Sequence, residues 1–129
     1  MIQEGKPMPI FAEWKDGKMV GVGSRFWIHA RETAKAITFL MEKGVPGEYY
    51  NIPGFDEMTN LQICEIIAEA VGKPLIADFV DFHSTRPGHD LRYALDGEKL
   101  KALGFTQSVP TIESLTKVVK WTLDNPKWL

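Results

Sequence analysis

The residues best suited to chemistry lie in one short run, Arg86-Pro87-Gly88-His89-Asp90-Leu91-Arg92-Tyr93. Two guanidinium groups, an imidazole, a carboxylate and a phenol stand there around a Pro-Gly pair, which predicts a turn. Guanidinium forks suit a phosphate, while His89 can add a ring N–H and Asp90 can hold a cation in place. The run therefore indicates an anion-binding loop. Composition alone leaves the alternative of a surface turn whose charges neutralise one another.

The sequence carries none of the short motifs typical of dinucleotide or P-loop phosphate binding, namely Gly-x-Gly-x-x-Gly and Gly-x-x-x-x-Gly-Lys-Ser/Thr. His29, His83 and His89 lack the close helical spacing of zinc ligands, so we expect no metal site. No nucleophile elbow supports a Ser/His/Asp triad, although the composition does not exclude one. Phosphate recognition is thus the best supported chemistry.

The composition is that of one globular domain spanning residues 1–129, with 44% hydrophobic and 25% charged residues. A net charge of -2 disfavours broad nucleic-acid binding. Cys64 is the only cysteine, which excludes an intrachain disulfide and fits a reducing cytoplasm. We find no apolar run long enough to cross a membrane and no signal peptide, so we expect a cytoplasmic protein with no membrane partner.

The hydrophobic pattern predicts strands separated by helices. The expected elements are a hairpin of 9–12 and 23–29 around Asp16-Gly17, a helix over 31–43, a strand over 48–52, a helix that follows a Thr59/Gln62 capping box and stops at Gly72, a strand over 75–82, a short helix from an Asp96 cap to Leu103, and a last helix capped by Thr111. This order indicates an α/β fold with a small, partly parallel sheet, packed helices and an N-terminal β-hairpin.

Several segments, in the same order, resemble the C-terminal lobe of an extended short-chain dehydrogenase/reductase. The nearest relatives by resemblance are the dTDP-glucose 4,6-dehydratases and the NAD-dependent nucleotide-sugar epimerase-dehydratases. The segments that carry the resemblance are Gly5–Ile10, Arg25-Phe26-Trp27-Ile28-His29, Gly47–Ile52, Asn60-Leu61, Arg86–Asp90, Tyr93–Asp96 and the tail Ser114–Leu129. They extend over nearly the whole chain, and the Arg-Pro-Gly-His-Asp run is the most specific of them.

The resemblance implies a role for four residues in binding a nucleotide-diphosphate sugar. Arg25 and Arg86 would hold the diphosphate, and Asn60 and His89 would help to bind the nucleotide. Two guanidinium groups from separate loops also suit a diphosphate on chemical grounds. The chain departs from the family at Phe26, where members usually carry Asp.

The resemblance also implies that this chain is part of a larger two-lobe enzyme, without its Rossmann domain. The full-length family enzyme uses NAD and a Tyr-x-x-x-Lys pair, and no tyrosine of this chain begins that sequence. Proton transfer needs such a group within hydrogen-bond reach of the substrate. We therefore expect no cofactor on this chain, no catalytic residue and no activity of the chain alone.

Two other functions stay open at the sequence level. The chain could be a non-enzymatic interaction module that forms a homodimer or pairs with a separate chain, which would supply the missing N-terminal Rossmann lobe in trans. It could also be an independent enzyme that uses His89 and Asp90 as acid and base.

Overall fold

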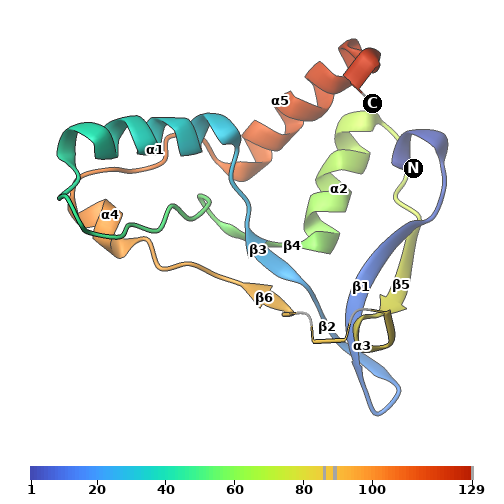
Figure 1. The fold of residues 1–129 in the computed structure, drawn as a ribbon. Coiled ribbons are helices and arrows are strands. Elements are labelled where there is room, and N and C mark those ends of the chain that lie inside the picture. The colour runs from blue at the N-terminus through green and yellow to red at the C-terminus, as the bar shows by residue number, and fades with distance from the viewer. Residues whose placement is uncertain (86, 89, 129) are drawn as a thin grey trace.

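The computed structural model of the protein describes residues 1–85, 87–88 and 90–128. It contains a three-stranded sheet in the order β2-β1-β5. Strand β1 (Met8–Lys15) pairs antiparallel with β2 (Lys18–Val22) and parallel with β5 (Ala77–Asp81). Figure 1 shows these strands together at one end of the molecule, below helix α2.

The expected hairpin turn is confirmed, but its second strand lies earlier than expected. Asp16 and Gly17 both have positive φ, at 50° and 74°, and Lys15 pairs directly with Lys18. Such a two-residue turn makes the chain pair at once, so β2 begins at Lys18 and not at Gly23. The prediction of a hairpin strand over 23–29 was therefore wrong.

Part of that segment belongs to a second sheet, in the order β4-β3-β6. Strand β3 (Ser24–Phe26) is central, antiparallel to β4 (Glu57–Thr59) and parallel to β6 (Arg92–Tyr93). Each sheet thus has one parallel and one antiparallel pair. The prediction of an α/β fold with a partly parallel sheet is confirmed, with two small sheets where one was expected.

Four helices follow the predicted pattern closely, but α3 was not predicted: the strand expected over 75–82 covers only Ala77–Asp81, and Phe82 begins this short helix. The described residues form α1 (Ala30–Lys43), α2 (Asn60–Val71), α3 (Phe82–Thr85), α4 (Glu98–Ala102) and α5 (Thr111–Asp124), with 3₁₀ turns η1 (Ile2–Glu4) and η2 (Pro126–Trp128). The Thr59/Gln62 capping box is present, and Gly72 ends α2 at a φ of 73°. Among the described residues, no helix is long and apolar enough to cross a membrane.

The caps expected for the last two helices differ from the structure. Asp96 Oδ1 accepts a hydrogen bond from the Glu98 backbone at 2.8 Å, although Gly97 takes the cap position of α4. Thr111 is the first residue of α5 and is not its cap. Its buried hydroxyl lies 3.5 Å from the Trp27 carbonyl instead, because residues 27 and 111 pack together.

The core lies between the first sheet and helix α2. Ile2, Ile10, Cys64 and Ala68 are buried there, surrounded by partly buried apolar side chains from β1, β5 and α2. Burial in this apolar setting raises the pKa of the Cys64 thiol. Helix α5 packs against α2 on the side that faces away from β1 and β5 (Figure 1).

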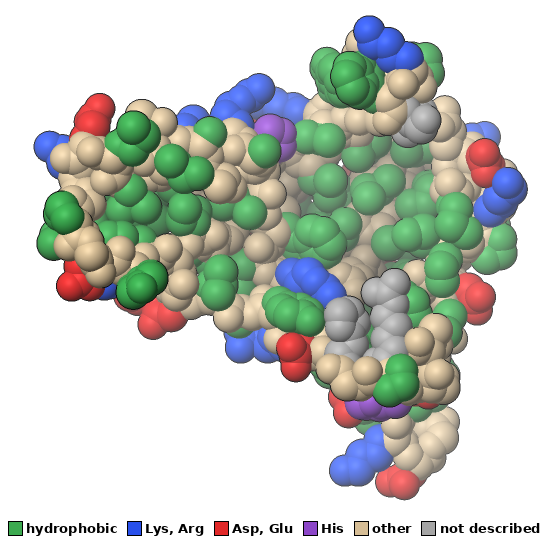
Figure 2. All heavy atoms as spheres, viewed as in Figure 1, with side chains coloured by type: hydrophobic (Ala, Val, Ile, Leu, Met, Phe, Trp, Pro, Cys, Tyr) green, Lys and Arg blue, Asp and Glu red, His purple; other side chains and the backbone are tan. Residues whose placement is uncertain are grey.

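Helix α1, the stretch 44–56 and helix α4 form an arm beside the second sheet (Figure 1). The predicted strand over 48–52 is absent, so that prediction was wrong. A strand needs a neighbour for its backbone groups, and no other described strand lies along this stretch. Side-chain hydrogen bonds hold this stretch in place instead. One example is the Asn51 amide, which donates to the Asp96 carbonyl at 3.0 Å. Figure 2 shows hydrophobic side chains spread over the visible face of this arm.

The capping box gives a first test of the fold. Thr59 Oγ1 accepts from the Gln62 backbone at 3.1 Å and Gln62 Oε1 accepts from the Thr59 backbone at 2.8 Å. We expect Thr59→Ala to lower the free energy of unfolding by about 1 kcal/mol, measured by urea denaturation.

The matched control is Thr38→Ala. Thr38 lies inside α1 and its hydroxyl donates to the Ala34 carbonyl, so it caps nothing. Its replacement should change the free energy of unfolding by less than about 0.5 kcal/mol. Equal losses in the two variants would contradict a capping role for Thr59.

Candidate anion-binding site

The structure brings together two of the four predicted site residues, Arg25 and Asn60. Arg25 lies on β3, and Asn60 is the first residue of α2. Arg25 Nη1 donates to Asn60 Oδ1 at 3.1 Å. This bond orients the amide so that its Nδ2 group remains a donor beside the guanidinium.

A close approach of the backbone at Gly23 makes this pairing possible. The Asn60 backbone N–H donates to the Gly23 carbonyl at 2.7 Å. A Cβ added at Gly23 would lie 2.9 Å from Asn60 Nδ2, which is closer than such atoms pack. Glycine at this position therefore leaves room for the Asn60 amide beside β3.

Tyr93 forms the third side of the site. The register of β3 and β6 places Arg25 opposite Tyr93, and the guanidinium carbon lies 4.9 Å from the centroid of the ring. Stacking on an aromatic face holds a guanidinium in place without neutralising its charge. The sequence signal for Tyr93 was its place after the arginine-rich run, but only the register pairs it with Arg25.

Arg25 and Arg92 differ in what they can offer an anion. No described carboxylate forms an ion pair with Arg25. Arg92, in contrast, donates from Nε and Nη2 to the two oxygens of Glu57, each at 2.7 Å. The sequence suggested Arg92 as a phosphate donor and Asp90 as a partner for a cation of this run. In the structure Arg92 forms its ion pair with Glu57 instead.

Glu57 is a residue that sequence reasoning missed. It accepts both bonds from Arg92 and a further one from Ser24 Oγ at 2.6 Å. The Arg92 hydrogen bonds and then the Ser24 hydroxyl lower the pKa of the Glu57 carboxyl to about 2. Glu57 is separated from Arg92 by more than thirty residues, so no local pattern reveals the pair.

The other two predicted residues, Arg86 and His89, lie outside the described residues. Pro87, Gly88 and Asp90 are described, and Gly88 has a φ of 75°, as expected of a Pro-Gly turn. The chain then returns to the site, where the Leu91 carbonyl accepts from the Ser24 backbone at 3.0 Å. The role predicted for Arg86 and His89 stays a prediction.

The described groups can bind an anion. Arg25 offers a guanidinium with no described carboxylate paired to it, Asn60 Nδ2 is a neutral donor, and α2 directs the positive end of its dipole toward the same place. A helix N-terminus and a guanidinium are both typical of phosphate sites. The geometry therefore supports recognition of a phosphate group.

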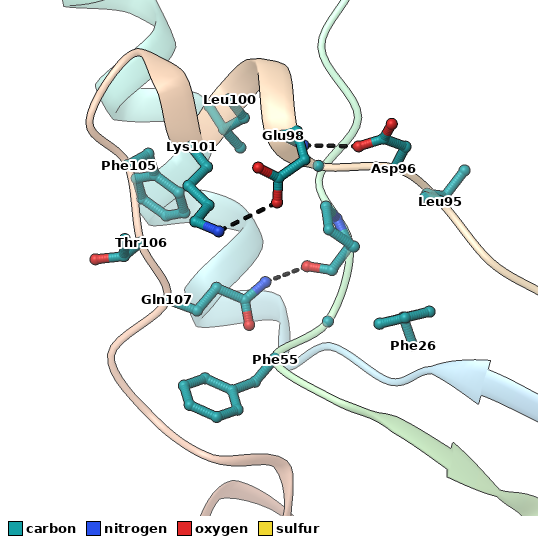
Figure 3. Close-up of a pocket in the computed structure, with 13 residues that line it drawn as sticks. Phe26, Phe55, Leu95, Asp96, Glu98, Leu100, Lys101, Phe105, Thr106 and Gln107 are labelled. Atoms are coloured by element: carbon teal, nitrogen blue, oxygen red, sulfur yellow. Dashed lines mark hydrogen bonds and ion pairs between the residues drawn. The ribbon is translucent and has the colours of Figure 1, made fainter.

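A separate cavity of about 460 Å³ lies between the arm and the second sheet. It is lined by side chains that include Phe26, Phe55, Leu95, Phe105 and Gln107 (Figure 3). Its polar groups bond to one another: Lys101 to Glu98, and the Gln107 amide to the Pro53 carbonyl. Neither Arg25 nor Asn60 lines it, and its polar groups do not converge on a ligand.

The described residues do not fit a dinucleotide. Such a site needs a glycine-rich turn between a parallel strand and the N-terminus of a helix. Here β1 enters a hairpin and β5 enters the four-residue helix α3. The described part of the chain also has no cluster of three or more metal-ligating His, Cys, Asp or Glu side chains.

The pKa of Glu57 gives a prediction about stability and pH. Its pKa in the folded chain is about 2, below the value of about 4.3 expected when unfolded. The stabilisation from the ionised group is therefore present above the unfolded pKa and is lost as the pH falls toward the folded one.

We expect Glu57→Gln to be less stable than the wild type at neutral pH, and the two to converge as the pH falls from about 5 to about 2. Urea unfolding of both proteins across this range measures the difference. Glu32, Glu48 and Asp81 also have lowered pKa values, so only the difference between the proteins isolates Glu57. A difference that does not change with pH would contradict the assignment.

Comparison with known proteins identifies homologues of this chain. No family model matches. The chain is 35% identical over 135 residues to a dTDP-glucose 4,6-dehydratase of Escherichia coli, and the match covers 96% of this chain and 35% of that protein. The chain thus spans about a third of the length of the curated relatives it matches.

Comparison with solved structures points to the same group of proteins. A dTDP-glucose 4,6-dehydratase from Bacillus anthracis, in complex with NAD, superposes with a TM-score of 0.77 at 32% identity, over 97% of this chain and 37% of that one. A UDP-glucose 4-epimerase from Bifidobacterium longum gives a TM-score of 0.72 over 97% of this chain and 38% of that one; at 21% identity it shows the fold alone. Sequence and fold together show that this chain is homologous to the C-terminal part of the dTDP-glucose 4,6-dehydratases, members of the extended short-chain dehydrogenase/reductase family.

Proposed function

We propose that this chain binds the diphosphate of a nucleotide-diphosphate sugar, a dTDP- or UDP-sugar, as the substrate-binding domain of a dehydratase or epimerase. Arg25 binds the diphosphate, and Asn60 donates beside it. Arg86 supplies a second guanidinium and His89 a ring N–H, as the sequence resemblance implies. The observation that carries the proposal is the Arg25 guanidinium, stacked on Tyr93 and bonded to Asn60, with no described carboxylate to neutralise it.

Homology supports the choice of ligand. The curated relatives are named for dTDP-glucose, and they match at least 94% of this chain. A diphosphate carries two adjacent negative groups, which a pair of arginines can bridge with charge-assisted hydrogen bonds. A nucleoside without phosphates would not use this chemistry.

We also propose that the chain does not catalyse the family reaction alone. NAD supplies hydride transfer in the family, and the described residues do not fit that cofactor. The sequence contains no Tyr-x-x-x-Lys pair to move the proton. Binding and orienting the sugar nucleotide is then the contribution of this chain, within a larger two-lobe enzyme.

A second candidate function is docking to a separate cofactor-binding chain that supplies a Rossmann lobe. The observation that favours it is the exposed apolar surface of the arm, where the exposed fraction is 91% for Tyr49, 82% for Met41 and 51% for Ile37. Apolar patches of this kind are typical of interaction surfaces. The extended stretch beside them has the composition of a strand but no neighbouring strand.

The docking proposal is tested by co-expression with the N-terminal lobe of the Escherichia coli relative. We expect the two chains to co-purify, and Tyr49→Asp to abolish the complex because it places a charge in an apolar contact. Trp128→Asp, on an exposed residue at the other end of the chain, is the control and should leave the complex intact. A homodimer of this chain alone, seen by light scattering, would assign the surface to a second copy.

The binding proposal is tested by calorimetric titration of the chain with dTDP-glucose and with UDP-glucose. We expect saturable binding, weakened at least about tenfold by Arg25→Gln because a charge-assisted phosphate bond is lost. Arg31→Gln removes the same charge from an exposed residue of α1 and should leave affinity nearly unchanged. Absence of binding to either ligand at millimolar concentration, or equal effects of the two variants, would refute the proposal.

A further inference from the structure

The second sheet is too small to hold its strands by backbone pairing alone. Strands β3 and β4 have three residues each, and β6 has two. So few ladder bonds leave a sheet of marginal stability. Arg25 and Tyr93 nevertheless stand on two of these strands, so the anion site depends on whatever fixes β6 beside β3.

One carboxylate joins all three strands. Glu57 on β4 accepts from Ser24 of β3 at 2.6 Å and from Arg92 of β6 through two parallel bonds of 2.7 Å. A bidentate fork fixes orientation as well as distance, which a single hydrogen bond does not. The Glu57 side chain is 28% exposed and the Arg92 side chain 61% exposed, so the fork lies at the protein surface, and its geometry, with two bonds of 2.7 Å, is what fixes β6.

The carboxylate acts from the opposite face of the sheet. The ladders pair Phe26 with Glu57 and Ser24 with Arg92, which places these side chains on one face. Arg25 alternates with Ser24 along β3, so Arg25 and its partner Tyr93 occupy the other face. Glu57 therefore does not touch an anion bound at Arg25.

We propose that Glu57 is a positioning residue of the anion site: its fork to Arg92 holds β6, and with it Tyr93, beside Arg25. The same fork engages the Arg92 guanidinium, so that of the two arginines on β3 and β6 only Arg25 stays available to an anion. This inference rests on the proposed function, because it takes the diphosphate to bind at Arg25.

The test measures dTDP affinity by calorimetry with the whole chain. Glu57→Gln and Arg92→Gln should each weaken binding about tenfold, since a loosened support misplaces the binding groups. The double variant should be no weaker than either single one, because the two residues act as a unit. Combining Glu57→Arg with Arg92→Glu re-forms an ion pair with exchanged charges and should recover most of the affinity.

Two controls separate positioning from charge and from loss of fold. Glu113→Gln breaks a 2.6 Å ion pair with Lys117 on α5, away from the site, and should leave dTDP affinity unchanged. Arg92→Lys keeps the charge but loses the planar fork, so it should weaken binding while the circular dichroism spectrum stays that of the wild type. It is also the milder variant if Glu57→Gln does not fold.

The outcomes distinguish this inference from the proposed function. Unchanged affinity in folded Glu57→Gln or Arg92→Lys overturns the positioning role and leaves the proposed function standing. Additive losses in the double variant, or no recovery on charge exchange, also overturn it. A wild-type chain that does not bind dTDP overturns the proposed function and this inference with it.

Discussion

The candidate site depends on one contact, the hydrogen bond from the Asn60 backbone to the Gly23 carbonyl. It joins Gly23, which lies between β2 and β3, to the first residue of α2, 37 positions away in sequence. The absence of a side chain at Gly23 leaves room for the Asn60 amide, and the capping box at Thr59 fixes where α2 begins. Because both conditions hold, the Asn60 amide meets the Arg25 guanidinium.

Local signals were enough to predict most of the helices. The Thr59/Gln62 box and Gly72 define α2 from residues within the helix or next to it, so no tertiary information is needed. Residues 48–52 show the opposite case. Their aromatic and branched composition is typical of a strand, yet a strand forms only when a neighbour accepts its backbone bonds, and no described strand does so.

The residues of the candidate site were predictable only in part. Arg25 and Asn60 could be named because a family resemblance covers their segments, although nothing in the spacing of the two residues places them in contact. Tyr93 and Glu57 could not be assigned, since their roles arise from the register between β3, β4 and β6. Register is set by pairing across the sheet, and it decides which side chains share a face.

Arg25 and Arg92 show why residue type alone does not define function. Both are arginines on neighbouring strands, and both can present a planar fork to an anion. Arg92 faces a carboxylate that accepts two of its donors, so its charge is already used within the protein. Arg25 faces an amide and an aromatic ring, which hold the guanidinium, and no carboxylate among the described residues forms an ion pair with it. The register of β3 against β6 thus places the two arginines on opposite faces of the second sheet, one beside Glu57 and the other beside Asn60 and Tyr93.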